Sequence, residues 1–334
     1  MDSKKAIMLL SGGLDSRLAM KIMLDQGVEL HALNHLTCFC TCTSKSSCKH
    51  EAVKAAEEMG VPMTVRNVTE EFLKIIENPP HGYGSGVNPC IDCRILLFKN
   101  ALQLMEEHGA SFLVTGEVLG ERPMSQRLEA MKLIERRAGV EGYVVRPLSA
   151  GALEPSIPEK LGWVDREAFH SITGRRREPQ FRLADELGVT DYPCPAGGCR
   201  LTDPGFARRM RDLLSHEGLS LSRVQLLRIG RHFRLSHRTK AVVGRDRTEN
   251  LALMSRALAG DLLLEVIDRP GPLTLLQDMP GPEEIHAAAA ITARYSQARN
   301  KKNVRVAVKR QGKEGGKTIE VAPAQEKIAG SLRI

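Results

Sequence analysis

The amino-terminal half of the chain alternates short apolar runs with longer segments whose apolar residues recur at helical spacing. Continuous apolar runs such as Ala6–Leu10 are typical of strands that are buried on both faces of a sheet. Because strands that alternate with helices form parallel sheets, the pattern predicts an α/β fold, a Rossmann-like parallel sheet with helices on both faces. We expect strands at 6–10, 29–36, 63–68, 112–115 and 143–146, and helices at 14–25, 49–59, 70–77 and 90–108.

The carboxyl-terminal half has a different pattern, with short strands and fewer helices. Residues 201–227 place leucines at helical spacing and arginines on the opposite side, which predicts a linker helix. Beyond it the pattern predicts strands at 232–235, 239–243, 261–268 and 304–309, a helix ending at Ala259 and a helix over 282–299, hence a small α+β domain. We expect a first domain over 1–203, a helical linker over 204–229, a second domain over 230–314 and a flexible tail over 315–334.

Composition and charge divide the chain at the same place. The net charge of +8 over 334 residues separates into −3 for residues 1–199 and +11 for residues 200–334. Such a basic carboxyl-terminal part favours a polyanionic partner, nucleic acid first, although a solvated basic surface gives the same count. Only 4% of the residues are Phe, Trp or Tyr, so phosphate contacts are favoured over stacking on aromatic rings.

The cysteines and the termini bear on the compartment. No apolar run approaches the ~18 residues of a membrane span, and the amino-terminal apolar run is too short for a signal peptide. We therefore expect a cytoplasmic protein with no membrane contact. Its eight cysteines then favour metal or sulfur chemistry over a disulfide framework.

The first strand turns into a helix through Ser11-Gly12-Gly13-Leu14-Asp15-Ser16. Backbone amides at such a turn form a nest for a phosphate-sized anion, and the hydroxyls of Ser11 and Ser16 add donors. Asp15 suits this site only with a bridging Mg²⁺, and the loop lacks the lysine of a Walker sequence. A tight turn without a ligand is the alternative interpretation.

This hexapeptide resembles the pyrophosphate loop (PP-loop) of the ATP pyrophosphatases that share the adenine-nucleotide α-hydrolase-like fold. The resemblance implies a fold of that type (HUP) and an enzyme that cleaves ATP between its α- and β-phosphates to adenylate a carbonyl oxygen. It implies a catalytic role for Asp15 and further nucleotide contacts at Leu36, which ends the second strand, and at Gly116, which follows the fourth. The loop residues that it implies for ATP are Ser11, Gly12, Gly13, Asp15 and Ser16.

Two cysteine groups follow later in the chain. Cys90 and Cys93 lie three residues apart at a helix start, where they share a face and the helix dipole favours thiolates. The second group runs from Cys194 to Cys199 and contains two glycines. Structural zinc would need all four thiolates, whereas a 4Fe–4S cluster can use three, and inert buried thiols are a third interpretation.

The residues around these cysteines carry a second resemblance. NPCIDCRILLF and GGCRLTD resemble the two active-site cysteine segments of tRNA 2-thiouridylases, and VTGE with the later RPL resembles segments of tRNA 4-thiouridine synthetases. The resemblance implies that Cys93 and Cys199 are the reactive, catalytic pair. With a cysteine also at Cys90, it implies the iron–sulfur version, in which Cys90, Cys93 and Cys199 hold a 4Fe–4S cluster; whether Cys194 is a ligand stays open.

A separate cysteine-rich loop follows the second strand. Cys38, Cys40, Cys42 and Cys48, with His50, would form a second metal site only if the loop turns. A relay thiol and a loop without chemical purpose are the alternatives.

The segment VVGRDRTENLALMSRALAGDLLLEVIDRPGP, with Tyr295–Arg299 after it, resembles the NFACT-R domain, an RNA-binding module. The resemblance spans about residues 231–312 and departs from the usual His-Ala pair at Glu265-Val266, so any role of that histidine is not carried over. The basic residues nearest the matching segments are Arg245, Arg247, Arg269, Arg299, Lys301 and Lys302.

Together these features lead to the hypothesis of an ATP-dependent tRNA uridine thiolase that uses Mg²⁺ and a 4Fe–4S cluster, with zinc as the alternative metal. Its partners would be tRNA and a sulfur-donor protein or inorganic sulfide, and a homodimer is compatible with the sequence. The alternatives are a cysteine-persulfide thiolase without a cluster, sulfur insertion into or amidation of a small molecule, and a non-catalytic ribosome-rescue factor.

Overall fold

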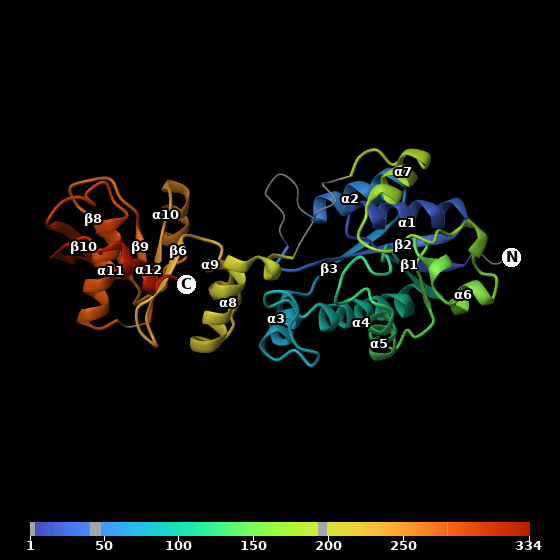
Figure 1. The fold of residues 1–334 in the computed structure, drawn as a ribbon, viewed down its shortest axis with the longest axis horizontal. Coiled ribbons are helices and arrows are strands. Elements are labelled where there is room, and N and C mark those ends of the chain that lie inside the picture. The colour runs from blue at the N-terminus through green and yellow to red at the C-terminus, as the bar shows by residue number, and fades with distance from the viewer. Residues whose placement is uncertain (1–3, 41–47, 193–198, 279) are drawn as a thin grey trace. The chain divides into compact units, whose positions relative to one another are not determined.

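The computed structural model describes residues 4–40, 48–192, 199–278 and 280–334 of the chain (Figure 1). The chain divides into two compact units, Met1–Thr202 and Asp203–Ile334. We expected the first domain to end at residue 203, beside this division. The linker expected at 204–229 contains two helices, α8 (Pro204–His216) and α9 (Leu221–Leu226), and both belong to the second unit.

The first unit is built on a five-stranded parallel sheet. Ala6 pairs with Leu30 on one side and with Phe112 on the other, so the first strand lies in the middle of the sheet. This parallel arrangement confirms the predicted fold class. The order is β3 (Met63–Asn67), β2 (Glu29–Leu36), β1 (Lys5–Leu9), β4 (Phe112–Thr115) and β5 (Val144–Val145).

Helices cover both faces of this sheet (Figure 1). Met8 packs toward α1 (Leu14–Asp25) and α2 (Cys48–Glu58), whereas its neighbour Ile7 packs toward α4 (Cys90–His108) and α5 (Leu128–Ala138). Successive side chains of a strand point to opposite faces, which explains why both residues are buried. Because the strands are parallel, the loops that follow their carboxyl ends all lie at one edge of the sheet.

The remaining helices of the first unit are α3 (Thr69–Glu77), α6 (Ile157–Lys160) and α7 (Glu178–Glu186). Leu183 and Ala184 of α7 pack on Leu14 and Leu18 of α1. Neither α5 nor α7 was expected from the sequence. Both are short and rich in charged residues, and their apolar faces find partners only in the folded unit.

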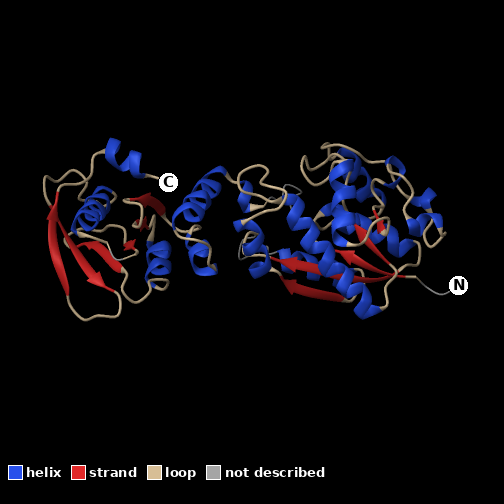
Figure 2. Cartoon of the chain, turned by 90° about the horizontal axis from the view of Figure 1, so that it is seen from below, coloured by secondary structure: helices blue, strands red, loops and turns tan. Residues whose placement is uncertain are grey.

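The second unit contains a six-stranded antiparallel sheet between two layers of helices (Figure 2). Val243 packs toward α11 (Pro282–Arg294) and α12 (Glu326–Leu332), and Val242 packs toward α9 and α10 (Arg247–Met254). This is the α+β domain that the sequence predicts. The strand order is β11 (Gly316–Val321), β10 (Val304–Arg310), β8 (Leu262–Val266), β9 (Thr274–Leu276), β7 (Lys240–Val243) and β6 (Arg231–Arg234).

The structure corrects the prediction of a flexible tail over 315–334. Val321 pairs with Val304 across β11 and β10, Ala329 of α12 is buried, and the Ile334 amide donates to the His232 carbonyl oxygen at 3.0 Å. The apolar residues of this segment are interspersed with Gly, Pro and charged residues, so its sequence shows no clear helix or strand pattern. Because these apolar residues are buried, the segment completes the core of the second unit.

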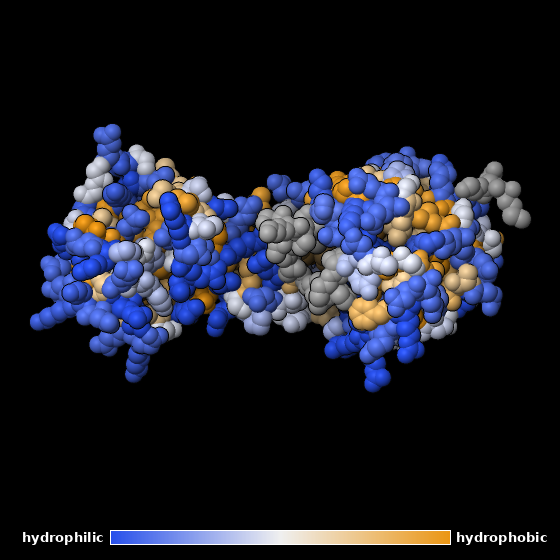
Figure 3. Space-filling model, turned by 90° about the horizontal axis from the view of Figure 1, so that it is seen from above, coloured by the Kyte–Doolittle hydropathy of each residue, from blue (hydrophilic) through white to orange (hydrophobic). Residues whose placement is uncertain are grey.

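Hydrophilic side chains dominate the face of each unit that Figure 3 shows, with apolar side chains scattered among them. Among the residues described, no helix combines the length and the apolar character that spanning a membrane requires.

Candidate nucleotide and sulfur site

The loop Ser11–Ser16 follows β1, the strand at which the order of the strands in the sheet changes direction. Strands β2 and β3 extend to one side of β1, and β4 and β5 extend to the other. In sheets of this kind, ligands bind at the reversal point, beyond the carboxyl ends of the strands. The loop therefore occupies the place where a nucleotide is expected.

Two glycines give this loop its shape. Gly12 has φ +81°, and a Cβ there would lie 2.6 Å from the Ala52 nitrogen, so only glycine fits. Gly13 has an ordinary φ of −78° and precedes α1 without a side-chain cap on the helix amides. Uncapped amides at a helix start, with the positive end of the helix dipole, form an anion-binding site.

Hydrogen bonds hold the two serines at the loop. The Ser11 and Ser16 hydroxyl oxygens lie 3.2 Å apart, and the Ser16 hydroxyl donates to the Gly13 carbonyl oxygen at 2.9 Å. Arg17, which is 1% exposed, donates from Nε to the Gly12 carbonyl oxygen at 3.2 Å and pairs with Glu58. A buried arginine, which was not predicted from the sequence, thus stabilises the loop.

Asp15 faces two charged partners from distant parts of the chain. Arg177, just before α7, places Nη1 2.6 Å from an Asp15 carboxylate oxygen and 3.2 Å from Glu121. Burial and the neighbouring Asp15 charge raise the pKa of the Glu121 carboxyl, against the effect of Arg177. Within the described residues, the buried Glu121 Oε2 has no hydrogen-bond partner.

This pair of carboxylates fits Mg²⁺. Two acidic side chains beside an anion-binding loop, one with an unpaired buried oxygen, supply the hard oxygen ligands that Mg²⁺ takes next to a polyphosphate. Asp15 was expected from the sequence. Glu121 was not, since only the fold brings the loop after β4 to the loop after β1.

Gly116 and Leu36, the two further residues expected to contact the nucleotide, lie differently relative to the loop. A Cβ on Gly116 would lie 2.5 Å from the Asp15 carbonyl carbon, so the backbone after β4 packs directly on the loop. Leu36 ends β2, next to β1, and its carbonyl oxygen accepts a hydrogen bond from the Val68 amide at 3.0 Å. Gly116 therefore touches the loop, whereas Leu36 marks the neighbouring strand end.

The cysteines gather at the same edge of the sheet. Cys90 and Cys93 open α4, and Cys199 forms an isolated antiparallel bridge with Cys40, which follows β2. The Arg200 amide donates to the Phe39 carbonyl oxygen at 3.1 Å and so holds the two segments together. Cys40, from the loop whose role the sequence left open, therefore belongs to this group of thiols.

Burial controls the protonation of these thiols. It raises the pKa of Cys93 to about 12, and Arg94 opposes the shift while Cys199, Cys90 and Cys40 add to it. Burial also raises the pKa of Cys199 to about 11 and that of Cys90, against Arg122 in both cases. The expectation that the helix start favours thiolates is therefore wrong for this state, because desolvation exceeds the effect of the dipole and the arginines.

The donor set fits a sulfur-ligated metal group in its chemistry. Cys90, Cys93 and Cys199 are thiols close enough to influence one another's pKa, and soft sulfur ligands suit zinc or an iron–sulfur cluster. Among the described residues, no three His, Cys, Asp or Glu side chains lie close enough together to hold an ion as they stand. Cys42 and Cys194 lie outside the described residues, as does the side chain of Cys48.

A buried ion network links the thiols to the loop. Glu117, 1% exposed and next to Gly116, pairs with Arg94 at 2.8 Å and with Arg146 at 3.1 Å. These cations lower the pKa of the Glu117 carboxyl although burial raises it. Arg94 follows Cys93 directly, so one carboxylate connects the strand end that touches the loop to the helix that carries the thiols.

Four exposed basic residues of the second unit lie in two adjoining turns. The Gln297 amide donates to the Pro270 carbonyl oxygen at 3.0 Å and ties the turn after β8 to the turn after α11. Arg245, in contrast, is paired with Glu249. The exposed cations of the tied turns are Arg269, Arg299, Lys301 and Lys302.

Comparisons with known proteins agree with this division. Residues 1–154 match the family model described as thiamine biosynthesis protein (ThiI), and residues 230–331 match the NFACT protein RNA binding domain. These matches confirm the resemblance of the amino-terminal part to the PP-loop enzymes and that of the carboxyl-terminal part to the NFACT-R domain.

Individual relatives match parts of the chain. It is 28% identical over 144 residues to tRNA-specific 2-thiouridylase MnmA of Bradyrhizobium sp. (strain ORS 278), covering 39% of this chain and 36% of the relative. It is 33% identical over 160 residues to a probable tRNA sulfurtransferase of Lysinibacillus sphaericus, covering 47% and 38%. A solved 4-thiouridine synthetase–RNA complex with bound ATP is 22% identical, with a TM-score of 0.38 over 63% of this chain and 50% of that one.

The chain thus spans about a third of the length of the first curated relatives it matches. The match to each family model is confined to one of the two units. Residues 1–154 are thus similar to the ThiI family, and residues 230–331 are similar to the NFACT RNA-binding domain.

Proposed function

We propose that this protein is an ATP-dependent tRNA sulfurtransferase that thiolates uridine. One observation carries the proposal: an anion-binding loop and a group of thiols lie at the same edge of one sheet, with Glu117 between them. Adenylation and sulfur transfer need these two sites near one uracil carbonyl group. The curated relatives named as tRNA thiolases support the assignment of tRNA as substrate.

The first step is adenylation. Amides of Gly12 to Ser16 hold the β- and γ-phosphates of ATP, and Asp15 and Glu121 hold Mg²⁺ against them. The uracil carbonyl oxygen attacks the α-phosphorus, a new O–P bond forms, and pyrophosphate leaves with the electrons of the broken P–O bond. This converts a poor leaving oxygen into AMP.

The second step replaces oxygen by sulfur. A sulfur nucleophile attacks the same carbon, and AMP leaves with the electrons of the C–O bond. Cys90, Cys93 and Cys199 would hold a 4Fe–4S cluster, which would supply the sulfur for this step. Because burial keeps these thiols protonated, they release protons when they take up metal, and Arg94 and Arg122 favour the charged state.

The second unit holds the tRNA. Its NFACT-type domain and its excess of positive charge support contacts with the phosphate backbone, with Arg269, Arg299, Lys301 and Lys302 in one basic group. The proposal includes a cytoplasmic location, because tRNA occurs in the cytoplasm and thiols stay reduced there.

The test is thiolation with purified components. Protein prepared without oxygen is incubated with unmodified tRNA, ATP, Mg²⁺ and sulfide, and AMP formation is measured alongside thiouridine by nucleoside mass spectrometry. We expect thiouridine and AMP in equal amounts, loss of both in Asp15→Asn, and loss of thiouridine in Cys199→Ser. The proposal would be overturned if correctly folded wild type formed no thiouridine, or if Asp15→Asn were as active as wild type.

The sulfur carrier is tested on the same preparation. About four irons per chain, and loss of iron together with thiolation in Cys90→Ala, support the cluster. Full activity of Cys90→Ala without iron overturns the cluster; a persulfide relay through Cys93 and Cys199 would then require a sulfur-donor protein that already carries sulfur as a persulfide, added in place of sulfide.

A further inference from the structure

The second unit has a cavity of about 740 Å³ that the sulfur-transfer proposal does not use. Its volume is in the range of small-molecule sites and is ample for one nucleotide. Five parts of the chain meet there: the end of α8, α9, the turn between β6 and β7, Asp278 after β9, and the start of α11. The lining residues are His216, Glu217, Arg223, Ser236, His237, Arg238, Thr239, Asp278 and Glu284.

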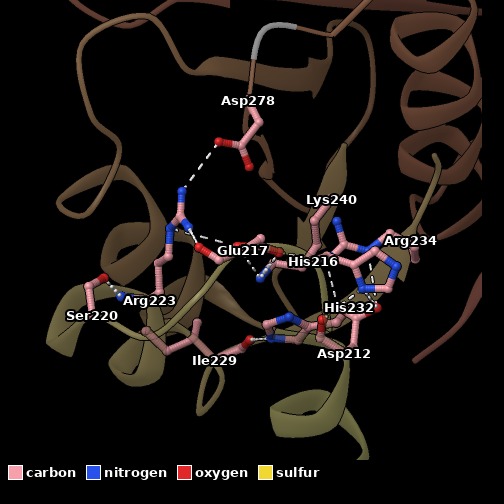
Figure 4. Close-up of polar contacts among 10 residues, drawn as sticks. All are labelled: Asp212, His216, Glu217, Ser220, Arg223, Ile229, His232, Arg234, Lys240 and Asp278. Carbon is pink, nitrogen blue, oxygen red and sulfur yellow. Dashed lines mark hydrogen bonds and ion pairs between the residues drawn. The ribbon is translucent and has the colours of Figure 1, made fainter. Parts of the chain in front are cut away.

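Glu217, which lines the cavity, belongs to a buried ion network that Figure 4 shows. Glu217, whose side chain is 4% exposed, accepts from Lys240 Nζ at 2.9 Å and from Arg234 Nη2 at 2.6 Å. Arg234 also pairs with Asp212. These contacts bind α8 to β6 and β7, so the wall is rigid before any ligand arrives.

Arg223 connects this wall to the opposite one. Figure 4 shows its guanidinium between Glu217 and Asp278: it donates to the Glu217 carbonyl oxygen and lies 3.6 Å from the Asp278 carboxylate. Asp278 has φ +66°, which no other non-glycine residue among those described shares in the positive range. The left-handed backbone turns this exposed carboxylate toward the cavity rim, where it can accept hydrogen bonds.

Two imidazole rings lie at the cavity rim. The rings of His216 and His237 are 5.1 Å apart between centroids and inclined by 61°. His216 Nδ1 lies 2.8 Å from the Asp212 carbonyl oxygen, and since a carbonyl only accepts, Nδ1 is the donor and the ring is fixed. His237 is exposed and is supported edge-on by this fixed ring, and Arg238 beside it is exposed as well.

We propose that this cavity binds one unpaired nucleotide of an RNA strand, with its base stacked on His237 and its phosphate at Arg238. Imidazole rings serve as stacking surfaces for unpaired bases, and the chain has few other rings to offer. The carboxylates of Asp278 and Glu284 then accept from an exocyclic amino group, so the site prefers adenine, cytosine or guanine over uracil. The inference rests on the proposed function in that the RNA is tRNA.

The test measures binding of the full chain to fluorescent oligo(A), oligo(U) and a blunt RNA duplex by anisotropy. We expect wild type to favour oligo(A) severalfold over oligo(U). His237→Ala should weaken oligo(A) binding about tenfold and duplex binding less than twofold, because removing a stacking side chain affects only unpaired bases. His237→Phe, which keeps a ring, should restore the affinity for oligo(A).

Two further variants separate the base from the phosphate. Asp278→Asn keeps a residue that tolerates the left-handed backbone but replaces an acceptor-only group, so the preference for oligo(A) should disappear. Arg238→Ala should lower the salt dependence by about one phosphate contact. Arg299→Ala is the matched control: it removes an exposed charge elsewhere and should weaken oligo(A) and oligo(U) equally.

The outcomes are distinguishable. Wild type that binds no RNA contradicts the tRNA part of the proposed function. Wild type that binds RNA, with His237→Ala and Asp278→Asn unchanged, overturns only the cavity assignment. Competition by free AMP as effective as by an oligo(A) strand of the same nucleotide concentration would assign the cavity to a free nucleotide and overturn the RNA assignment. Thiolation activity is measured in parallel, so failure of sulfur transfer is read independently of binding.

Discussion

Arg177 Nη1 lies 2.6 Å from each carboxylate oxygen of Asp15, so an arginine 162 residues further along the chain holds the acidic residue of the PP-loop. Both side chains are partly exposed, at 22% and 18%. Mg²⁺ would need the same carboxylate oxygens. The ion pair therefore opposes metal binding until Arg177 turns away.

We expect Arg177→Ala to lower the Mg²⁺ concentration for half-maximal ATP binding threefold to fivefold, since a partly exposed pair is worth up to about 1 kcal/mol. Isothermal titration with ATP over a Mg²⁺ series measures the change. Arg176→Ala, at an exposed neighbouring arginine, is the control and should leave the value unchanged. A higher Mg²⁺ requirement in Arg177→Ala would mean that the arginine supports the polyphosphate instead.

The two glycines of the loop should respond differently to alanine. Gly12→Ala places a Cβ 2.6 Å from the Ala52 nitrogen at a left-handed backbone, so the variant should be destabilised by at least about 1 kcal/mol. Gly13→Ala meets only Ser11 Oγ at 3.5 Å and should keep wild-type stability, while its methyl group hinders the anion and weakens ATP binding. Thermal unfolding and ATP titration on both variants separate the effects. Equal loss of stability in both would contradict this account of the loop.

The buried thiols of the metal-free protein should alkylate with an unusual pH dependence. With the Cys199 pKa raised to about 11 by burial, its thiolate fraction rises about a thousandfold between pH 7 and pH 10. An ordinary thiol with a pKa of about 8.5 gains only about thirtyfold over that range. The rise of the alkylation rate with pH does not depend on how accessible a thiol is, because accessibility changes the rate at every pH by the same factor.

Iodoacetamide labelling followed by peptide mass spectrometry gives the rate at each cysteine. Cys93, with a pKa of about 12, should rise at least as steeply as Cys199. Free cysteine in the same solution is the reference. A plateau below pH 9 at either residue would show that the arginines, not burial, control protonation.

The sequence was sufficient for those features that local chemistry determines. The apolar runs located β1, β2 and β4, and the PP-loop was evident because its glycines and serines are contiguous. Features that depend on tertiary contact were not accessible. Arg177 and Glu121 reach Asp15 only after the strands are ordered. The position of Gly116–Gln126 after a strand placed that loop near the ligand, but it did not single out Glu121, and nothing in the sequence indicated Arg177.

Protonation and the carboxyl-terminal segment show the same limit. The helix start at Cys90 suggested thiolates, but desolvation depends on how neighbouring segments cover the thiols, and it has the larger effect. The last residues look polar in sequence because Val321 and Ala329 are spaced among Gly and Lys. Their burial depends on a strand pairing that only β10 provides.

Glu117 should be essential to the stability of the first unit. Glu117→Gln removes a buried charge and leaves Arg146 and Arg94 with one fewer partner, so the free energy of unfolding should fall by about 3 kcal/mol. Glu129→Gln, on the exposed side of α5, should change it by less than about 0.5 kcal/mol. Urea unfolding at pH 7 measures both.

The pH dependence of this difference is specific. The arginines hold the folded-state pKa of Glu117 below its value of 4.5, so its contribution is fully present above pH 4.5 and is lost as the pH falls through the folded-state pKa. The gap between wild type and Glu117→Gln should therefore be constant from pH 7 to pH 5 and shrink below that. A gap that widens on acidification would mean that Glu117 is protonated in the folded protein and that the network with Arg94 and Arg146 is not ionic.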